Sequence, residues 1–259
     1  MKRAFADLPE GQIHYRFEGI GEPLLLLHAA VTSSGEYSRV IPFLSKYYRV
    51  IAMDFPGNGD SDSAPYPYQI PDHAQTVLNF MDYLDIEKTS IVGHHAGASV
   101  ATELAVTWPD RLNKLVLSGL GIRPGPDEGI PFKDPPNFTS PVEIKQDGSH
   151  LVEWWRRANL WGDPPDIVEE RVLEYIKAGP RGEEIHLASG AYNLKVRLPL
   201  INCPTLVLIG TKDPFYSMAE GVRKLVPSSK FTIIENGPIH VDRTMPGEFA
   251  KAILRFLME

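Results

Sequence analysis

The chain has 259 residues, of which 43% are hydrophobic, with 26 basic and 33 acidic side chains and a formal net charge of −7. A chain of this size buries about 75% of its unfolded surface, and the composition is that of a soluble globular protein, which excludes disordered and fibrous classes. The acidic balance argues against nucleic acid as a partner, because nucleic-acid-binding proteins normally present a basic face.

The sequence also bears on location. The longest aliphatic run covers residues 24–27, far short of the ~20 residues of a membrane span. The first residues, Met1, Lys2 and Arg3, lead into mixed polar sequence rather than the apolar stretch of a signal peptide. Cys203 stands alone, so no internal disulfide can form, which fits a reducing compartment. We expect a cytoplasmic protein without a membrane partner, and the sequence leaves its oligomeric state open.

Strands alternate with helices in the predicted order of the first half of the chain. Apolar, β-branched runs predict strands over residues 1–6, 12–18, 24–27, 48–53, 89–92 and 114–117. Helical spacing of apolar residues predicts helices over residues 72–84 and 96–107. Asp72 is the expected N-cap of the first of these helices. The alternation is typical of a mostly parallel sheet with helices on both faces.

The alternation stops after residue 121. Six of the 23 prolines lie between Pro124 and Pro141, in a polar stretch that we do not expect to form regular structure. Two helices are predicted next, over residues 151–160 and 166–178. Strands then resume at 205–209 and 231–234, and helices at 217–226 and 246–257. We expect one α/β domain, formed by residues 1–121 and 198–259, with residues 122–197 inserted over it.

The turn at residues 93–97 carries the first chemical signal. A strand, a sharp turn of small residues and a helix start follow one another here. This is the context of the nucleophile elbow, G-x-S-x-G, whose glycines permit a strained strand-to-helix turn. Gly93 and Gly97 occupy the glycine positions, but His95 stands where the motif has serine.

Further motifs, in the expected order, make the chain resemble the α/β-hydrolase superfamily along nearly its whole length. Residues 24–30 resemble that family's third strand and His-Gly oxyanion loop, with Ala29 in place of the glycine. Residues 54–62 are similar to its D-x-P-G-x-G-x-S-x loop. Residues 209–213 resemble the strand end that carries the triad acid, and residues 237–240 the loop that carries the triad histidine. The resemblance implies an α/β-hydrolase fold in which the insertion is a helical cap.

The resemblance also implies roles for individual residues. His240 would be the general base, oriented by Asp213. The backbone N–H groups of Ala30 and Ala96 would form the oxyanion hole. Simpler roles are an exposed loop histidine for His240 and a helix N-cap for Asp213.

His95 has several possible roles. The N-terminus of the following helix disfavours a cation by about 0.3–1 kcal/mol, and a charged His240 would act in the same direction. We therefore expect His95 to be largely neutral at pH 7. It could be a nucleophile that forms an acyl-imidazole, or an acid–base group of a lyase-like enzyme that performs elimination or C–C cleavage. The protein could also bind a ligand without turnover, or His95 could be a substitution for serine in an ordinary hydrolase.

Substrate contacts are expected from the insertion. One tryptophan of Trp154 and Trp155, together with Arg157, would line the entrance and favour aromatic or carboxylate-bearing substrates. His28 belongs to the same candidate set, although a structural hydrogen bond beneath its loop is its alternative role. No H-E-x-x-H or paired-cysteine spacing occurs, and adjacent histidines in a strained turn cannot easily share one ion, so no metal is expected.

Taken together, the sequence predicts a cofactor-free enzyme that cleaves a small ester, lactone or activated carbonyl compound. The predicted catalytic residues are His95, Asp213 and His240. The expected partner is a small-molecule substrate.

Overall fold

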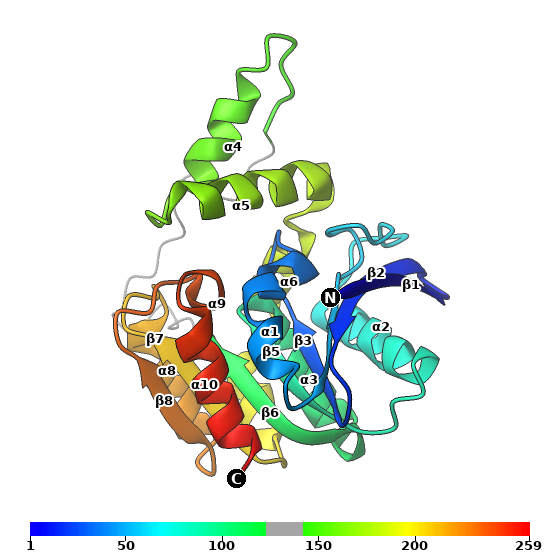
Figure 1. Cartoon of the computed structure of the whole chain (residues 1–259), viewed down its shortest axis with the longest axis vertical. Helices are drawn as coiled ribbons and strands as arrows, with labels where there is room; N and C mark the ends of the chain where they lie inside the picture. The colour runs from blue at the N-terminus through cyan, green and yellow to red at the C-terminus, as the bar shows by residue number, and fades with distance from the viewer. Residues whose placement is uncertain (123–141) are drawn as a thin grey trace.

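The computed structural model describes residues 1–122 and 142–259 (Figure 1). Within these residues, eight strands form one sheet in the order β1-β2-β4-β3-β5-β6-β7-β8. The strands are β1 Lys2–Leu8, β2 Gly11–Glu18, β3 Pro23–Leu27, β4 Arg49–Met53, β5 Thr89–His94, β6 Leu112–Ser118, β7 Thr205–Gly210 and β8 Lys230–Ile234. The pairs β1–β2 and β2–β4 are antiparallel, and all other neighbouring pairs are parallel. The predicted mostly parallel sheet of an α/β-hydrolase fold is confirmed.

Helices cover both faces of the sheet (Figure 1). Helices α2 Ile70–Tyr83, α3 Ala96–Thr107 and α8 Tyr216–Leu225 pack on one face, and α1 Ile41–Leu44 and α10 Pro246–Leu257 on the other. A short helix, α9 Val241–Thr244, precedes α10. Short 3-10 helices in the described residues are η1 Ser34–Arg39, η2 Pro109–Arg111, η3 Gly179–Arg181 and η4 Leu198–Leu200.

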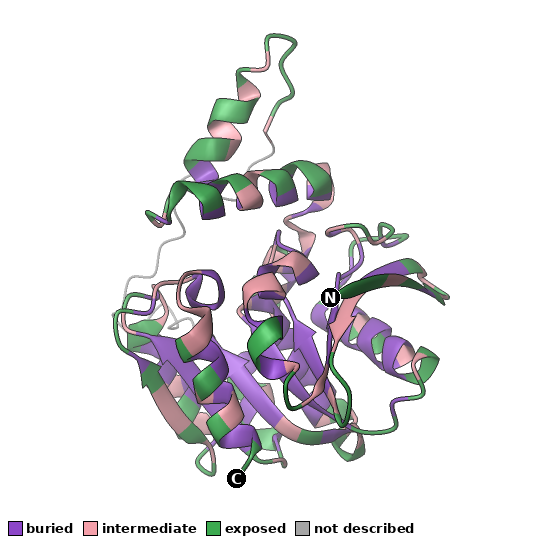
Figure 2. Cartoon of the chain, viewed as in Figure 1, coloured by how far each residue is buried: buried purple, intermediate pink, exposed green. Residues whose placement is uncertain are grey.

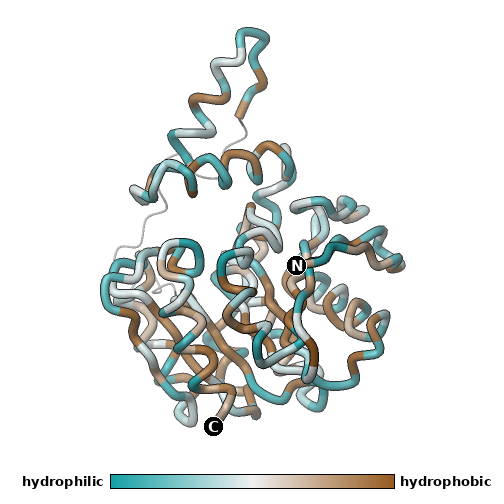
Figure 3. The backbone as a smooth tube through the Cα atoms, in the orientation of Figure 1, coloured by the Kyte–Doolittle hydropathy of each residue, from teal (hydrophilic) through white to brown (hydrophobic). Residues whose placement is uncertain are grey.

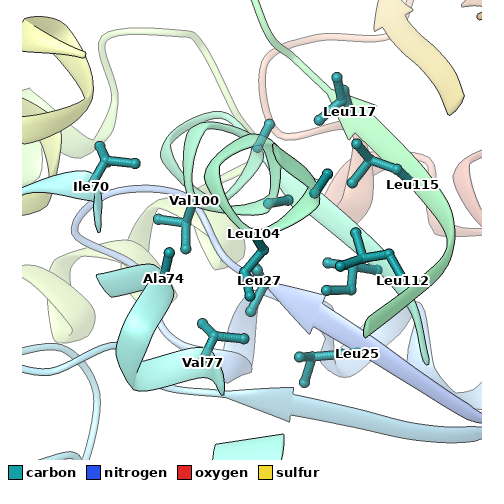
Figure 4. Close-up of a cluster of buried hydrophobic side chains, with 14 of the residues drawn as sticks. Leu25, Leu27, Ile70, Ala74, Val77, Val100, Leu104, Leu112, Leu115 and Leu117 are labelled. Carbon is teal, nitrogen blue, oxygen red and sulfur yellow. The ribbon is translucent and has the colours of Figure 1, made fainter. Parts of the chain in front are cut away.

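The run of four leucines in β3 shows why the strand needs apolar residues at every position. Successive side chains of a strand point to opposite faces. Leu25 and Leu27 pack in the cluster beneath α2 and α3 (Figure 4). Leu24 and Leu26 pack in the cluster beneath α1 and α10. Because helices cover both faces, all four side chains are fully buried, and each stabilises the fold by roughly 1.5–3 kcal/mol.

Helix α2 begins earlier than predicted. Its cap residue is Gln69, and Pro71 lies in the first turn, where proline is favoured because its missing N–H has no intrahelical partner. The Asp72 carboxylate accepts a hydrogen bond from the Gln69 N–H at 2.8 Å. Asp72 is therefore the third residue of a capping box, and its predicted role as the N-cap is wrong.

Residues 142–197, which we call the inserted segment, connect β6 to β7 in the described part of the chain. The segment contains α4 His150–Ala158, α5 Pro165–Ala178, α6 Glu184–Ala191 and α7 Leu194–Arg197. Helices α4 and α5 extend beyond the sheet and expose much of their surface (Figures 1 and 2). The predicted irregular stretch between residues 124 and 141 lies outside the described residues.

Sequence periodicity gave no indication of α6 or α7, because helices of eight and four residues are too short to show it. The most hydrophobic stretches lie inside the main body, along the strands (Figure 3). Of the helices in residues 1–122 and 142–259, none has the length and apolar character needed to cross a membrane.

A buried carboxylate holds the loop after β4 in place. Asp54 accepts hydrogen bonds from His14 Nδ1 at 2.8 Å, from the Ser34 N–H at 2.6 Å and from the Asp60 N–H at 2.9 Å. Burial raises the pKa of Asp54, but these hydrogen bonds and the nearby His28 outweigh it and lower the pKa to about 2. Asp54 thus ties β2 and η1 to the loop that follows β4.

We expect Asp54→Asn to lower the free energy of unfolding by about 2 kcal/mol at pH 7, because a pKa lowered from 3.8 to about 2 favours the folded state by that amount. This contribution is present above the unfolded pKa and is lost as the pH falls from 4 towards 2. Urea unfolding at several pH values measures it, with the exposed Asp110→Asn as the control. A deficit that stayed constant down to pH 3 would contradict the assignment.

Candidate active site

The turn that presents His95 is strained. His95 has φ 47° and ψ −110°, a positive φ that residues other than glycine rarely adopt. A Cβ on Gly93 would collide with the backbone at Gly97, and a Cβ on Gly97 would collide with the backbone at Leu27. Only glycines therefore let the turn approach itself and β3 so closely. This is the geometry of the nucleophile elbow, held by the packing around it.

The His95 ring lies against the end of β6 and faces Asp213. Its Nε2 is 3.2 Å from Asp213 Oδ2, although the alignment is not that of a hydrogen bond. A Cβ on Gly119 would lie 2.6 Å from the same nitrogen, so the ring occupies space that only a glycine leaves open. Phe215 contacts the ring, with 5.4 Å between centroids.

The pKa of His95 shifts in the direction opposite to the sequence-based expectation. Burial lowers the pKa of His95, but the carboxylates of Asp213 and Glu36 outweigh it, and the net shift is upward from 6.5. A buried carboxylate at this distance favours the cation more than the helix N-terminus disfavours it. A larger fraction of His95 is therefore protonated at pH 7 than of an ordinary histidine, and the expected direction of the pKa shift is corrected.

His240 pairs with an acid that the sequence did not indicate. Its Nδ1 is 2.6 Å from Asp163 Oδ2, and Arg171 Nη1 is 3.7 Å from the same oxygen. All three residues are buried. The expected pairing of His240 with Asp213 is thereby corrected. An imidazole extends farther from its Cα than a serine hydroxyl does. The His95 ring therefore contacts Asp213 itself, in the place where the His240 ring was expected.

The surroundings of His240 favour its neutral form. Burial, together with the positive charges of Arg171 and Arg243, lowers the pKa of His240 well below 6.5. Burial raises the pKa of Asp163, while the same two arginines oppose that shift. We assign the Nδ1 proton of neutral His240 as the donor to the Asp163 carboxylate. This assignment leaves Nε2 with a lone pair that can accept a proton.

A cavity of about 370 Å³ brings the candidate residues together. His95 and His240 both line it, as do Ala30 and Ala96, while Asp213 lies behind the His95 ring. Other lining residues come from the inserted segment: Trp161, Arg171, Tyr175, His186, Ser189, Gly190, Tyr192, Asn193, Leu194 and Lys195. The volume suits a small molecule.

Ala30 and Ala96 occupy the positions expected for an oxyanion hole. Ala96 is the first residue of α3, and the first N–H groups of a helix have no intrahelical acceptor. Ala30 follows β3, and both residues line the cavity. Their role in binding an oxyanion stays a prediction.

The expected substrate-binding residues do not form part of the cavity wall. Trp154 stacks on Tyr175 with 5.2 Å between centroids, Trp155 is 40% exposed, and Arg157 Nε is 3.4 Å from Glu153 Oε1. His28 Nε2 accepts a hydrogen bond from the Phe55 N–H at 2.9 Å, which is its alternative, structural role. Helix α4 thus directs its tryptophans onto α5 or into solvent.

Trp161 and Arg171 line the cavity in their place. Arg171 lies on the buried face of α5 with Ile167, Val168, Glu174 and Tyr175. Charged residues within a mostly apolar helical stripe are a usable sequence signal of a buried site. Asp163 gave no such signal. It stands in a Gly-Asp-Pro-Pro run, which is typical of any loop.

Two groups of side chains in residues 1–122 and 142–259 have the spacing of metal ligands. In the first, His14, Asp54 and Asp60, the Asp54 oxygens already accept the hydrogen bonds described above. The second is Glu36, His94 and Asp242, all buried.

In this second group, His94 already has polar partners. Both ring nitrogens of His94 have polar contacts at 3.0 Å, with Ser118 Oγ and with the Ile239 carbonyl. Burial and the nearby Glu36 raise the pKa of Asp242 well above its usual range. His94 Nε2 is 3.5 Å from Asp242 Oδ1, and neither Asp242 oxygen has a hydrogen-bond partner among the described residues.

Comparison with known proteins agrees with the fold. A family model described as the alpha/beta hydrolase fold matches residues 22–166. A 2-hydroxy-6-oxononadienedioate/2-hydroxy-6-oxononatrienedioate hydrolase of Pseudomonas putida is 31% identical over 88% of this chain and 83% of its own. The (E)-2-((N-methylformamido)methylene)succinate hydrolase of Acinetobacter baylyi is 27% identical over 94% and 93%. The crystal structure of an enol-lactonase from Burkholderia xenovorans has a TM-score of 0.82 at 20% identity, covering 99% of this chain and all of that one. The relatives are named hydrolases, and the predicted enzyme class is confirmed.

We expect Asp213→Asn to lower the pKa of His95, because the variant removes the negative charge nearest to the ring. The asparagine oxygen can still accept the Phe215 N–H that Asp213 Oδ1 accepts at 2.8 Å, so the loop should be preserved. Titration of the histidine ring signals by NMR measures the shift, with His95→Gln used to assign the resonance. Asp110→Asn is the control, and an unchanged His95 pKa in Asp213→Asn would refute the contact.

Proposed function

The chain belongs to the α/β-hydrolase fold family, and we propose that it hydrolyses a small, carboxylate-bearing ester, lactone or activated carbonyl compound. Residues 122–197 would act as the cap over the site. The observation that carries the proposal is the pair of imidazoles, His95 and His240, in one cavity, each against its own buried aspartate. Environments that separate the pKa values of two such groups are a mark of an acid and a base.

The charges around the cavity support an anionic substrate. Among the described residues of its wall, Arg171 and Lys195 are cationic and none is a carboxylate, since Asp163 and Asp213 lie behind the imidazoles. The Arg171 guanidinium lines the cavity, and its positive charge would favour a substrate carboxylate. The succinate and nonadienedioate derivatives in the names of two relatives bear carboxylates.

General acid–base hydrolysis fits this geometry best. His240 Nε2 would take a proton from water as the water oxygen attacks the substrate carbonyl. The N–H groups of Ala30 and Ala96 would stabilise the resulting oxyanion. As the C–O bond breaks, protonated His95 would give its proton to the leaving alkoxide, or to carbon if a C–C bond is cleaved. The raised pKa of His95 suits the acid, and the lowered pKa of His240 keeps the base unprotonated.

A covalent route is the second candidate, favoured by the position of His95 at the elbow. In this route neutral His95 would attack the carbonyl and form an acyl-imidazole, which water activated by His240 would then hydrolyse. The two routes require opposite protonation states of His95. The dependence of turnover on pH therefore separates them.

We expect kcat/KM to fall at high pH as His95 loses its proton above pH 6.5, and to fall at acid pH only well below 6.5, where His240 gains one. The covalent route predicts the reverse at high pH: kcat/KM rises through the His95 pKa, with a product burst and an acyl adduct on His95 seen by mass spectrometry. Simple alkyl esters, whose leaving alkoxide needs a proton, serve as substrates for the pH profile, and nitrophenyl esters for the burst.

Variants test the same assignment. His95→Gln and His240→Gln should each lower kcat/KM by about 10²–10⁴-fold, whereas His150→Gln, which lies outside the cavity wall, should not. His95→Ser tests the scaffold: a rise in esterase activity would show an ordinary serine hydrolase arrangement. Full activity of either imidazole variant would overturn the proposed catalytic roles, whereas a wild-type protein that binds these esters and releases no product would favour ligand binding without turnover.

A pair of esters tests the substrate class. Arg171→Gln should lower kcat/KM for mono-4-nitrophenyl succinate by about 10–100-fold more than for 4-nitrophenyl acetate, because a charged hydrogen bond contributes roughly 1.5–3 kcal/mol. The ratio between the two esters cancels any general loss of active protein. An unchanged ratio would assign the anion preference elsewhere.

A further inference from the structure

The carboxylate that contacts the His240 ring belongs to the inserted segment. The Asp163 and His240 side chains are 1% and 7% exposed, and 2.6 Å separates Asp163 Oδ2 from His240 Nδ1. Asp163 lies in the short connection between α4 and α5. Asp213, at the end of β7, contacts His95. The two imidazoles therefore use carboxylates from two different parts of the fold.

The segment that carries Asp163 is docked on the main domain by further polar contacts. Glu174 of α5 accepts hydrogen bonds from Ser33 Oγ at 2.9 Å and from Arg243 Nη2 at 2.6 Å. Arg39 contacts both Asp166 and Glu170 at 2.8 Å. Because these partners belong to η1 and α9, α5 is fixed to the main domain along its length.

One short stretch of the main domain receives two of these contacts. His240 and Arg243 lie three residues apart at α9. They contact Asp163, just before α5, and Glu174, in the third turn of α5. Both contacts are buried. Seating α5 on α9 therefore places the Asp163 carboxylate against the His240 ring.

We propose that Asp163 is a positioning residue for His240. It holds the ring with its Nδ1 proton towards the inserted segment and its Nε2 lone pair towards the cavity, so the base is complete only when that segment is docked. The inference rests on the proposed function, in which His240 is the base. A carboxylate that fixes the tautomer of a catalytic histidine in this way contributes strongly to turnover.

The groups that face the His240 ring come from four elements. Arg171 of α5 and Arg243 of α9 are cationic, and His94 and His95 approach from β5 and the elbow. Asp163 is the negative group in contact with the ring. Its loss would leave the ring without an acceptor for Nδ1–H among mostly cationic neighbours.

The test is Asp163→Asn, which keeps the size of the side chain and offers an amide N–H to Nδ1 in place of the carboxylate. We expect the ring to change from the Nδ1–H to the Nε2–H tautomer, and kcat to fall by about 100-fold or more with a smaller change in KM. The ring ¹⁵N shifts of His240 report the tautomer without any substrate. Asp163→Glu, which restores the charge, should recover part of kcat.

Glu169→Gln is the matched control, since it removes an exposed carboxylate of α5 that takes no part in the docking contacts described above. It should leave kcat within about twofold and the His240 tautomer unchanged. Wild-type protein with His240 in the Nε2–H tautomer would overturn the proposal even if Asp163→Asn failed to fold. So would a folded Asp163→Asn variant with wild-type kcat.

The outcome of His240→Gln separates the two proposals. If His240→Gln keeps full activity, the proposed function fails, while the ring ¹⁵N shifts still report whether Asp163 sets the tautomer. If His240→Gln is inactive and Asp163→Asn is not, the function stands and Asp163 is only a structural partner.

Discussion

The contact between the His95 ring and the Asp213 carboxylate determines how the rest of the site is arranged. It requires the strained turn after β5 and the open space above Gly119, because neither a relaxed turn nor a side chain at that glycine would let the ring lie there. It also requires the parallel order β5-β6-β7, which brings the carboxyl ends of these strands to one edge of the sheet. The charge of Asp213 then raises the pKa of a ring that burial alone would keep neutral.

A consequence of this contact is that His240 has a different partner. Since His95 occupies the space in front of Asp213, His240 pairs with Asp163 from the inserted segment. The candidate acid and base therefore have separate carboxylates and opposite pKa shifts. Two histidines that shared one carboxylate would be harder to hold in different protonation states, because they would interact directly with the same charge.

The inserted segment contributes both chemistry and selectivity in this arrangement. Arg171 is involved in both substrate selectivity and the arrangement of the base, because it lines the cavity and its Nη1 is also 3.7 Å from the Asp163 carboxylate. A buried arginine of this kind needs nearby acceptors, and the carbonyl of Ala158 and the hydroxyl of Tyr175 supply them. Recognition of an anion and orientation of the base thus depend on the same helix, α5.

The sequence was enough to predict the mostly parallel sheet, the strand-to-helix turn at His95 and the loop that carries His240, because strand and helix periodicity and glycine-containing turns are local properties of the chain. It also placed Ala30 and Ala96 correctly beside the cavity. The three-dimensional structure was needed to establish which aspartate contacts which histidine and in which direction the pKa of His95 shifts. It was also needed to show that Trp161 and Arg171 line the cavity, rather than Trp154, Trp155 and Arg157. Those outcomes depend on distances between residues far apart in the chain, such as the 77 positions between Asp163 and His240, and on the phase with which α4 and α5 pack, which no local pattern encodes.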